Sequence, residues 1–519
     1  MLSFLQYLFS QSDKLLEQTL THVGLTMLSL LLALLAGIPL GILIARQKRL
    51  ASVVLGIANI LQTVPSLALL GILIPALGIG IGPALAALFL YALLPIIRNT
   101  YVGIQEVDPA VKDAAKGLGM TDRQILTRVE LPLALPVLFA GIRTAAVINV
   151  GVATLAAYVA AGGLGEFIFG GIALSNVNMM LAGAIPAALL AVGFDTALAF
   201  LQRLSRRGLQ TGAIAFLLGL PLLTAFTLLP GKRDKLVAGF AHEFYGRADG
   251  YPGLQKIYGL KLRPRLIDQN LMYEAIYRKQ VDVISGYSTD GRIRAFDLQV
   301  LDDDKKAFPP YFAAPVVRKA TLDRYAELGP TLDGLAGKLT DAVMTELNYQ
   351  VDYLKKSPAE VARDFLQRNR LYQTPRPGPR PQRIVMGSKV FTEQYILAEI
   401  YRQLIEGHTN LGVDARTGLG GTQICFDALR TGAIDFYPEY TGTGLLVILQ
   451  PDARTLAALP MQADTVYKFV KQQFKQRYNL VWLRPLGFNN SYSLMMRKAD
   501  TQTLGIDSIS DLVARINRP

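Results

Sequence analysis

The sequence predicts an all-α polytopic membrane domain of about six transmembrane helices, followed by an α/β domain with two lobes. Residues 21–230 are dominated by Leu, Ala, Gly, Ile and Val, whereas residues 231–519 have the composition of a soluble domain. Six apolar runs in the first part are long enough to cross a bilayer. The second part repeats a pattern of helix, strand and tyrosine. A chain of 519 residues has room for two or three domains.

Composition and charge narrow the functional classes. The net charge is +13, but the basic residues form no tract with interleaved aromatic side chains, so nucleic acid is not an expected partner. Several of them instead lie in short clusters between apolar segments, as in membrane proteins. Cys425 is the single cysteine, which excludes an intrachain disulfide, and one Cys with three His argues against a Cys/His metal site. We expect no metal and no nucleic acid.

The apolar runs define a multi-pass membrane domain over residues 1–230. Asp13 and Glu17, with no basic segment before the first run, argue against a cleaved signal peptide. Basic clusters follow the first, third and fifth runs, and the positive-inside rule assigns that side to the cytoplasm. Six spans then place the chain from residue 231 outside the cytoplasm of a bacterial inner membrane. The runs lie at about 21–45, 52–76, 82–98, 135–161, 178–202 and 210–229.

The loop over residues 105–136 contains "DPAVKDAAKGLGMTDRQILTRVELPLALP". Small residues precede a glycine that permits a sharp turn, and a Leu-Pro pair follows at a fixed spacing. The segment resembles the coupling loop of ABC importer permeases, although Asp113 stands where the family has Glu and Val129 where it has Ile. An amphipathic hairpin of another transporter is the alternative. The resemblance implies that the residues coupling the domain to an ATPase are Asp113, Ala114, Ala115, Gly119, Leu131 and Pro132.

The soluble part contains an internal repeat. "NLMYEAIYRKQVDVISGYSTDG" aligns without gaps on "QICFDALRTGAIDFYPEYTGTG", which places Tyr287 on Tyr440. Each copy predicts an amphipathic helix, a turn, and a strand that ends in tyrosine. Two such units predict two lobes facing each other across a cleft. Ligands of these sheets bind beyond the carboxyl ends of the strands, where both tyrosines lie.

Several motifs resemble the binding proteins for quaternary amines of the glycine betaine, choline and ergothioneine group. They include "GSKVFTEQ", "DFYPEYTGTG", "PLGFNNSYSL" and "EFYGRADGYPGL". The resemblance implies a type II periplasmic-binding-protein-like domain over residues 231–519, but its two halves stand in reversed order. This predicts a circular permutation: residues 231–372 match the family's C-terminal half, 373–382 are a Pro-rich joint, and 383–519 match its N-terminal half. Independent globules for the two halves would contradict it.

The expected ligand chemistry follows from the trimethylammonium group, which cannot donate conventional hydrogen bonds and suits aromatic faces. The resemblance assigns Tyr287, Tyr311, Tyr440 and Tyr492 to an aromatic cage. A ligand carboxylate can be anchored by the guanidinium of Arg247 or by Lys389 in the Gly-Ser-Lys turn. Some relatives carry an acidic residue at the position of Gln423, and a neutral side chain there favours a betaine with a carboxylate. Neutral hydrogen bonds are expected from Thr443, Asn489 and Asn490.

These observations predict the permease and substrate-binding subunit of an ATP-driven importer for quaternary ammonium compounds. Betaine-type osmoprotectants (glycine betaine, carnitine or choline) are the expected ligands, and ergothioneine or another trimethylammonium amino acid is an alternative. The chain has no GxxxxGK[ST] phosphate loop. We therefore expect no cofactor in this chain, a separate ATPase subunit that uses ATP, and a homodimer through the membrane domain. A ligand-gated channel or sensor and a membrane enzyme are the other classes. The coupling loop argues against the channel, and the lack of a nucleophile–base pair argues against the enzyme.

Overall fold

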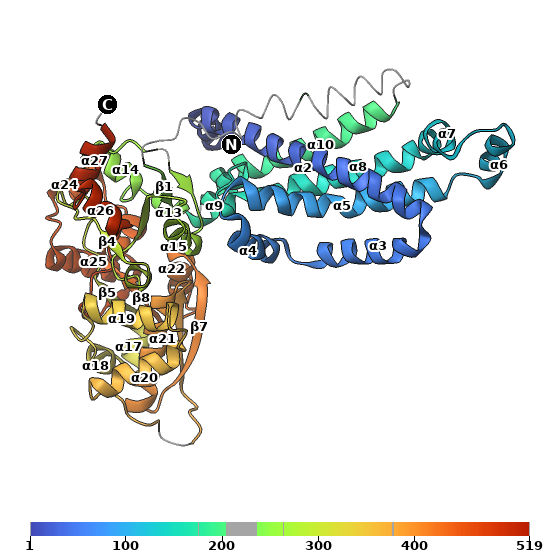
Figure 1. The fold of residues 1–519 in the computed structure, drawn as a ribbon. Helices are drawn as coiled ribbons and strands as arrows, with labels where there is room; N and C mark the ends of the chain where they lie inside the picture. The colour runs from blue at the N-terminus through green and yellow to red at the C-terminus, as the bar shows by residue number, and fades with distance from the viewer. Residues whose placement is uncertain are drawn as a thin grey trace. The chain divides into compact units, whose positions relative to one another are not determined.

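The computed structural model describes residues 2–174, 176–203, 219, 236–262, 264–375 and 378–517 (Figure 1). Contacts between residues divide the chain into two compact units. One comprises Met1–Glu243 with Pro264–Gln280, and the other comprises Phe244–Arg263 with Val281–Pro519.

The described residues up to Arg203 are mainly helical. Among the described residues, four helical segments are long and apolar enough to cross a membrane, at Ser12–Arg46, Ile81–Gln105, Asp122–Val159 and Val177–Arg203. The helices are α1 (Leu2–Ser10), α2 (Ser12–Arg46), α3 (Lys48–Thr63), α4 (Ser66–Leu77), α5 (Ile81–Gln105), α6 (Pro109–Gly117), α7 (Asp122–Ile125), α8 (Leu131–Ala153), α9 (Gly165–Ala173) and α10 (Val177–Arg203), with a π-turn at Leu126–Glu130 and a 3-10 turn at Thr154–Val159.

The run predicted as a span at 52–76 contains two helices. Arg49–Thr63 and Ser66–Leu77 are bent by 100° at a short break. Val64 has extended backbone angles and Pro65 caps α4, because a residue before proline is driven out of the helical region. The pair counts as a fifth span only if this broken element crosses the membrane. The sixth predicted span, 210–229, lies outside the described residues.

Helices α2, α5, α8 and α10 form the core of this unit (Figure 1). Small residues let the helices approach closely: a Cβ on Gly41 would lie 2.5 Å from Cβ of Thr100, and one on Gly141 would lie 2.7 Å from the carbonyl of Pro95. Buried polar contacts also join α8 to α2, where Asn149 donates to Ser29 at 2.9 Å and His22 contacts the carbonyl of Val150 at 3.1 Å. Close packing and these contacts give the bundle a defined register.

The α/β part contains two five-stranded sheets with the same topology. The first has the order β2-β1-β3-β10-β4 and the second β7-β6-β8-β5-β9. We call each sheet with its helices the first lobe and the second lobe. The strands are β1 (Ala238–Phe240), β2 (Arg265–Leu266), β3 (Val283–Tyr287), β4 (Leu298–Val300), β5 (Ala313–Arg318), β6 (Arg383–Lys389), β7 (Gly412–Gly420), β8 (Phe436–Tyr440), β9 (Leu480–Trp482) and β10 (Tyr492–Arg497).

Each lobe takes its fourth strand from the other half of the soluble sequence. Strand β10 pairs antiparallel with β3, and β5 pairs antiparallel with β8. The first lobe therefore needs a strand from residues 383–519, and the second needs one from residues 231–372. The two halves are not independent globules.

Helices connect and cover these strands. Helix α21 contacts β6, β7 and β8, and α25 contacts β9. The helices are α13 (His242–Gly246), α14 (Tyr251–Tyr258), α15 (Gln269–Tyr277), α16 (Arg292–Ala295), α17 (Lys319–Arg324), α18 (Leu328–Asp333), α19 (Asp341–Asp352), α20 (Pro358–Arg368), α21 (Thr392–His408), α22 (Thr422–Thr431), α23 (Thr441–Thr443), α24 (Ala453–Ala458), α25 (Ala463–Tyr478), α26 (Lys498–Leu504) and α27 (Ile509–Asn517), with a π-turn at Gly444–Leu449.

The repeat predicted from sequence is present as structure. Helix α15 leads into β3, which ends at Tyr287, and α22 leads into β8, which ends at Tyr440. The second opening strand is longer than expected, since β6 continues to Lys389, which pairs with Gly420 across an irregularity in the register. Lys389 therefore ends a strand and does not lie in a turn.

The described part of the Pro-rich joint lies at the end of α21. His408 contacts the carbonyl of Leu371 at 2.8 Å. Arg380 donates to the carbonyls of Leu411 and Glu406, at 2.8 and 2.6 Å. Arg380, in the described part of the joint, is thus held at the end of α21 and beside the start of β7.

Candidate functional site

Five aromatic rings form a continuous row that joins the two lobes. Tyr492 and Tyr287, paired across β10 and β3, have stacked rings with centroids 5.2 Å apart. Tyr311 meets Tyr492 edge-on at 5.8 Å. On the other side, Phe391 lies 6.1 Å from Tyr287 and 6.3 Å from Tyr440. The four tyrosines predicted for the cage are therefore together, with Phe391 as a fifth ring between the lobes.

Two positively charged side chains already lie on tyrosine faces of this row. The guanidinium carbon of Arg247 is 5.3 Å from the ring centroid of Tyr492, and the ammonium nitrogen of Lys389 is 5.1 Å from that of Tyr440. Such distances permit cation–π attraction, which gains strength when the pair is removed from water. The ring faces thus attract cations.

Each of these cations is bound by a carboxylate. Arg247 holds Asp249 through two hydrogen bonds, of 2.8 and 2.5 Å, and Asp249 also accepts from the hydroxyl of Tyr311. Lys389 lies 2.6 Å from Glu439, in a pair whose side chains are 7% and 0% exposed. Both groups predicted to anchor a ligand carboxylate are therefore paired with protein carboxylates in this structure.

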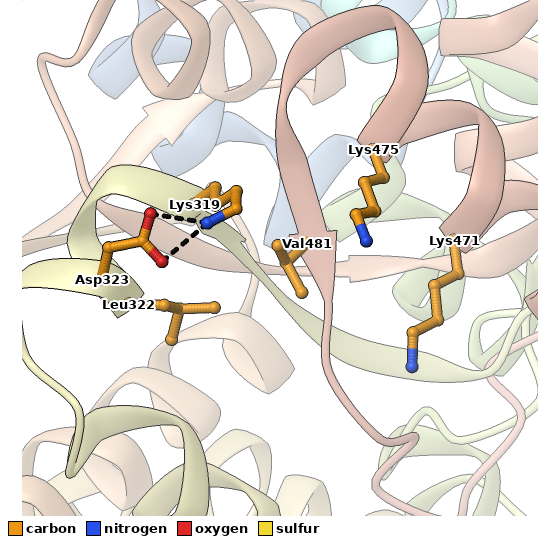
Figure 2. Close-up of a pocket in the computed structure, with 6 residues that line it drawn as sticks. All are labelled: Lys319, Leu322, Asp323, Lys471, Lys475 and Val481. Carbon is orange, nitrogen blue, oxygen red and sulfur yellow. Dashed lines mark hydrogen bonds and ion pairs between the residues drawn. The ribbon is translucent and has the colours of Figure 1, made fainter.

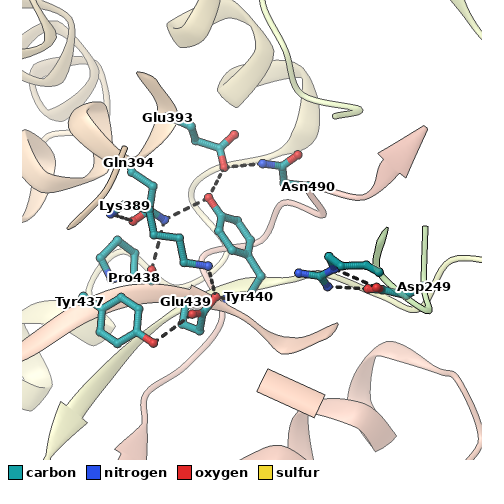
Figure 3. A network of polar contacts seen from close by, with 10 residues as sticks. Asp249, Lys389, Glu393, Gln394, Tyr437, Pro438, Glu439, Tyr440 and Asn490 are labelled. Atoms are coloured by element: carbon teal, nitrogen blue, oxygen red, sulfur yellow. Dashed lines mark hydrogen bonds and ion pairs between the residues drawn. The ribbon is translucent and has the colours of Figure 1, made fainter. Parts of the chain in front are cut away.

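Glu393, near the start of α21, is a buried carboxylate with four hydrogen-bond donors. Its Oε1 accepts from the hydroxyl of Tyr440 at 2.6 Å and from the amide of Asn490 at 2.9 Å (Figure 3). Its Oε2 accepts from the hydroxyl of Thr289 at 2.7 Å and from the amide of Asn348 at 3.2 Å. Thr289 follows β3 of the first lobe, so this carboxylate binds both lobes together. Burial raises the pKa of the Glu393 carboxyl, against the effect of its four donors.

The hydroxyls of Tyr440 and Tyr311 remain protonated and donate hydrogen bonds. Burial, and then the charge of Glu393, raises the pKa of Tyr440 well above its ordinary value. Burial, and then Asp249, does the same for Tyr311. Each tyrosine therefore donates to a carboxylate and leaves its ring face for other contacts.

The remaining predicted residues fall in two groups. Asn490 belongs to the site through Glu393, and Asn489 accepts from the backbone amide of Tyr311 at 2.6 Å. Thr443 is buried in α23, three residues after Tyr440. Gln423 lies in α22, where its amide donates to Asp427 on the same helix at 3.1 Å. Gln423, the side chain from which a betaine ligand was inferred, is thus hydrogen-bonded within its own helix.

Several residues of the site were not predicted from the sequence, among them Phe391, Glu393, Asp249 and Glu439. Phe391 and Glu393 lie in "GSKVFTEQ" and Asp249 in "GRADG", segments that otherwise supplied predicted residues. A carboxylate two residues after an arginine was the available signal for Asp249. Nothing local indicates that Glu393 meets Thr289, because 104 residues separate them.

A separate pocket of about 220 Å³ lies at the other end of the second sheet (Figure 2). Its floor includes Leu322 and Val481, and its rim carries Lys471, Lys475 and the ion pair of Lys319 with Asp323. Ala313 of β5 pairs with Tyr440, whereas Arg318 at the opposite end of β5 pairs with Leu480. The pocket therefore does not include the aromatic row.

The predicted coupling loop has the expected turn and helix. Helix α6 begins at Pro109 after Asp108, whose carboxylate accepts from the amide of Ala110 at 2.8 Å. Gly119 has a φ of +75°, which side chains with a Cβ rarely adopt. Leu118 beside it is 79% exposed. Asp113 and Ala114 are exposed and Ala115 is buried, while Leu131 and Pro132 begin α8.

A buried carboxylate fastens this loop to the helix bundle. Glu130, in the π-turn before α8, is 1% exposed and forms ion pairs with Arg46 at the end of α2 and, at 3.6 Å, with Lys112 of α6. Lys112 also donates to the carbonyl of Ile104 in α5 at 3.0 Å. Three helices and the loop therefore meet at Glu130, and a displacement of α6 must disturb these contacts.

Comparisons with known proteins agree with both parts of the chain. A family model described as "Binding-protein-dependent transport system inner membrane component" matches residues 37–211. The choline transport system permease protein OpuBB of Bacillus subtilis (strain 168) is 43% identical over 206 residues, which are 40% of this chain and 95% of that protein. The osmoprotectant import permease protein OsmW of Salmonella typhimurium (strain LT2) is 46% identical over 203 residues, 38% of this chain and 94% of that protein.

The soluble part has its own matches. A solved structure of a glycine betaine/carnitine/choline ABC transporter is 37% identical, with a TM-score of 0.23, and covers 27% of this chain and 52% of that one. The family model described as "Substrate binding domain of ABC-type glycine betaine transport system" matches residues 228–368 and 382–518, more than half of the chain. Both families are transport components and not enzymes. The chain therefore belongs to the ABC-type glycine betaine transport family, and the model of the membrane component matches a separate part of it.

Proposed function

We propose that this chain is the permease and substrate-binding subunit of an ATP-driven importer for quaternary ammonium compounds. The observation that carries the proposal is the aromatic row between the lobes, where two positive side chains already lie on tyrosine faces. A trimethylammonium group also carries a diffuse positive charge, which is stabilised in the same way by the faces of electron-rich rings. Relatives of the permease part are named for transport of choline and of osmoprotectants, which supports this ligand class.

The coupling loop supports transport driven by a separate ATPase subunit. Exposed Leu118 beside the turn at Gly119, and the ion pairs at Glu130, provide a surface attached to three membrane helices. In our proposal two copies of the chain pair in the inner membrane and dock two ATPase subunits on this loop. Lobe closure on the ligand shifts the dimer toward the state that promotes hydrolysis, because the ligand binds the closed lobes more tightly.

We further propose that the substrate-binding domain is circularly permuted and extracytoplasmic. The exchange of β5 and β10 and the short joint at α21 support the permutation, since the two halves build one fold and their ends lie close together. The basic clusters after the first, third and fifth apolar runs support the sidedness. Reporter fusions at the two sides of the membrane would test it.

Reconstitution tests the function directly. The full chain with its ATPase subunits in proteoliposomes should accumulate labelled choline or glycine betaine only with ATP on the ATPase side. Gly119→Val should abolish capture of the ATPase subunit, because the new side chain cannot hold a φ of +75°. Gly117→Val, at the end of α6 with no atom within 4 Å of an added Cβ, is the matched control. ATP-independent currents on ligand addition would refute the importer in favour of a channel.

A further inference from the structure

An ion pair lies within two of the helical segments that are long and apolar enough to cross a membrane. Arg143 of α8 donates to Asp195 of α10 through two hydrogen bonds, from Nε to Oδ1 and from Nη2 to Oδ2, both at 2.8 Å. Asp195 lies about 12 Å along α10 from its last residue, Arg203. Arg143 lies about 18 Å along α8 from its first residue, Leu131. Both charges are therefore inside the apolar segments and not at their ends.

This pair lies at the surface of the helix bundle. The side chains of Arg143 and Asp195 are 33% and 39% exposed, whereas Asn149 and Ser29, which join α8 to α2, are fully buried. Two parallel hydrogen bonds hold the charges together, so neither side chain is free to extend toward water at the membrane surface. Charged groups are costly in hydrocarbon, and those in membrane helices almost always face protein or a water-filled cavity. We therefore expect this surface to be covered by something other than lipid.

The side chains around the pair are small. One helical turn from Arg143 or Asp195, the exposed and half-buried side chains are alanines and valines, namely Ala140, Val147, Ala191, Val192 and Ala199. A different face of α10 carries Leu189 and Phe200, which are 66% and 64% exposed, as lipid-facing side chains are. Small residues are typical of the surfaces on which membrane helices approach each other closely. We call Arg143, Asp195 and these five small neighbours the ion-pair face.

We propose that a second copy of this chain packs on the ion-pair face, so that Arg143 meets Asp195 of the partner subunit and Asp195 meets Arg143 of the partner subunit. This inference rests on the proposed function, in which two copies pair in the membrane. Both copies cross the membrane in the same direction, so the two-fold axis that relates them runs along the membrane normal and the two ion pairs lie at the same depth. An isologous interface brings the same patch of each subunit together. A patch with one charge of each sign is complementary to itself.

The ion pair leaves hydrogen-bonding capacity for the second copy. Within the described part of the chain, Arg143 uses two of its five N–H donors on Asp195, and each oxygen of that carboxylate accepts one hydrogen bond although it can accept two. The small neighbours let the helices of two copies approach closely enough for the remaining groups to meet. Helix α8 also begins directly after the coupling loop, so a displacement of that loop reaches the interface through one helix.

The test uses two differently tagged copies of the full chain, expressed together and extracted from the membrane in lipid nanodiscs. One tag is captured and the amount of the other is measured. Arg143→Asp and Asp195→Arg each give the chain two like charges on the ion-pair face. Copies of one variant should capture each other at least about tenfold less than wild type, because four like charges meet at the interface.

The two variants expressed together provide the decisive measurement. Arg143→Asp with Asp195→Arg should recover capture to within about threefold of wild type, since opposite charges face each other across the two-fold axis. Neither chain in this mixture regains its own ion pair. The recovery can therefore come only from contact between copies.

A further variant leaves the ion pair in place. Ala140→Phe adds a large side chain to the ion-pair face and should lower capture about fivefold or more, because the two copies can no longer approach closely. Gly193→Phe is the matched control, since an added Cβ there would meet no neighbour within 4 Å and Gly193 lies on the side of α10 that carries Leu189 and Phe200. It should leave capture as in wild type. Folding is checked by the amount of each variant in the membrane and by the fluorescence of Trp482, the single tryptophan.

The outcomes distinguish this inference from the proposed function. Mixed capture as low as that of either variant alone, or unchanged capture for Ala140→Phe, would overturn the inference. The pair would then be covered within one chain, as by the sixth predicted span at 210–229. ATP-driven uptake by wild type in proteoliposomes would leave the proposed function standing in that case. Wild-type copies that do not capture each other would refute the two-copy importer itself.

Discussion

Glu439→Gln removes the negative partner of the buried ion pair with Lys389. The carboxylate is fully buried, lies 2.6 Å from the ammonium nitrogen, and also accepts from the hydroxyl of Tyr437 at 2.9 Å and from the amide of Tyr440 at 2.7 Å. Glutamine keeps the volume and one acceptor oxygen. The change therefore leaves a buried ammonium group without its counter-charge.

Breaking a buried pair in this way costs about 3–5 kcal/mol, because the remaining charge loses its partner but stays out of water. We expect about 3 kcal/mol here, the lower end of that range, since the glutamine oxygen can still accept from Lys389. The double variant Lys389→Met with Glu439→Gln removes both charges. It should recover at least about 1.5 kcal/mol of the loss, because a neutral buried pair leaves no charge unpaired.

Trp482 makes this measurable in the full chain. It is the single tryptophan and is buried in the core of the second lobe, in β9. Its fluorescence during denaturant unfolding therefore reports on the lobe that contains Lys389 and Glu439, and the midpoint and slope give the change in free energy. A loss below about 1 kcal/mol for Glu439→Gln, or a double variant less stable than the single one, would refute the reasoning.

Three further results are expected. Tyr440→Ala should weaken binding of a quaternary ammonium ligand by about tenfold or more, since it removes a ring face and the link to Glu393; unchanged affinity in calorimetry would contradict the cage. Glu130→Ala should leave ligand affinity unchanged but lower ligand-stimulated ATP hydrolysis in the reassembled complex by about fivefold, because Arg46 and Lys112 lose the carboxylate that joins them to the loop; normal stimulation would contradict that role. Burial raises the pKa of Glu393 above its ordinary 4.5, so the folded lobe holds this proton more tightly than the unfolded chain does. The stability of the second lobe should then fall as pH rises from 4.5 through the raised value. Glu393→Gln should remove this contribution to the change of unfolding free energy with pH. A variant whose unfolding free energy changes with pH as in wild type would contradict the prediction.

Local periodicity was sufficient to predict the elements that carry the cage. The helix–strand–tyrosine pattern placed Tyr287 and Tyr440 at strand ends, because the pattern depends on residues near each other in sequence. The glycine turn of the coupling loop was predicted for the same reason. The run 52–76 was predicted as a span from its apolar length, and the bend within it follows from the effect of Pro65 on Val64.

Partners far apart in sequence were not predictable in the same way. The exchange of β5 and β10 between lobes leaves no periodic signal, since each strand has the same pattern in either sheet. Arg247 and Lys389 lie on the rings of Tyr492 and Tyr440, but their carboxylate partners were not anticipated. Whether a buried cation is available to a ligand depends on its neighbours in space, and Glu439 is 50 residues from Lys389.

The strand exchange has a consequence for biosynthesis. Ser493 of β10 bonds to Gly286 of β3, 207 residues earlier in the chain. During translation β3 must therefore wait, with one edge of its sheet unpaired, until nearly all of the second lobe has been made. Neither half can mature as a folded product of its own, so a ribosome that stops before Tyr492–Arg497 leaves both an incomplete sheet and an incomplete ring row. Unpaired strand edges are a feature by which cellular quality control can recognise such incomplete chains. Their removal would prevent a chain that cannot bind ligand from docking on an ATPase subunit.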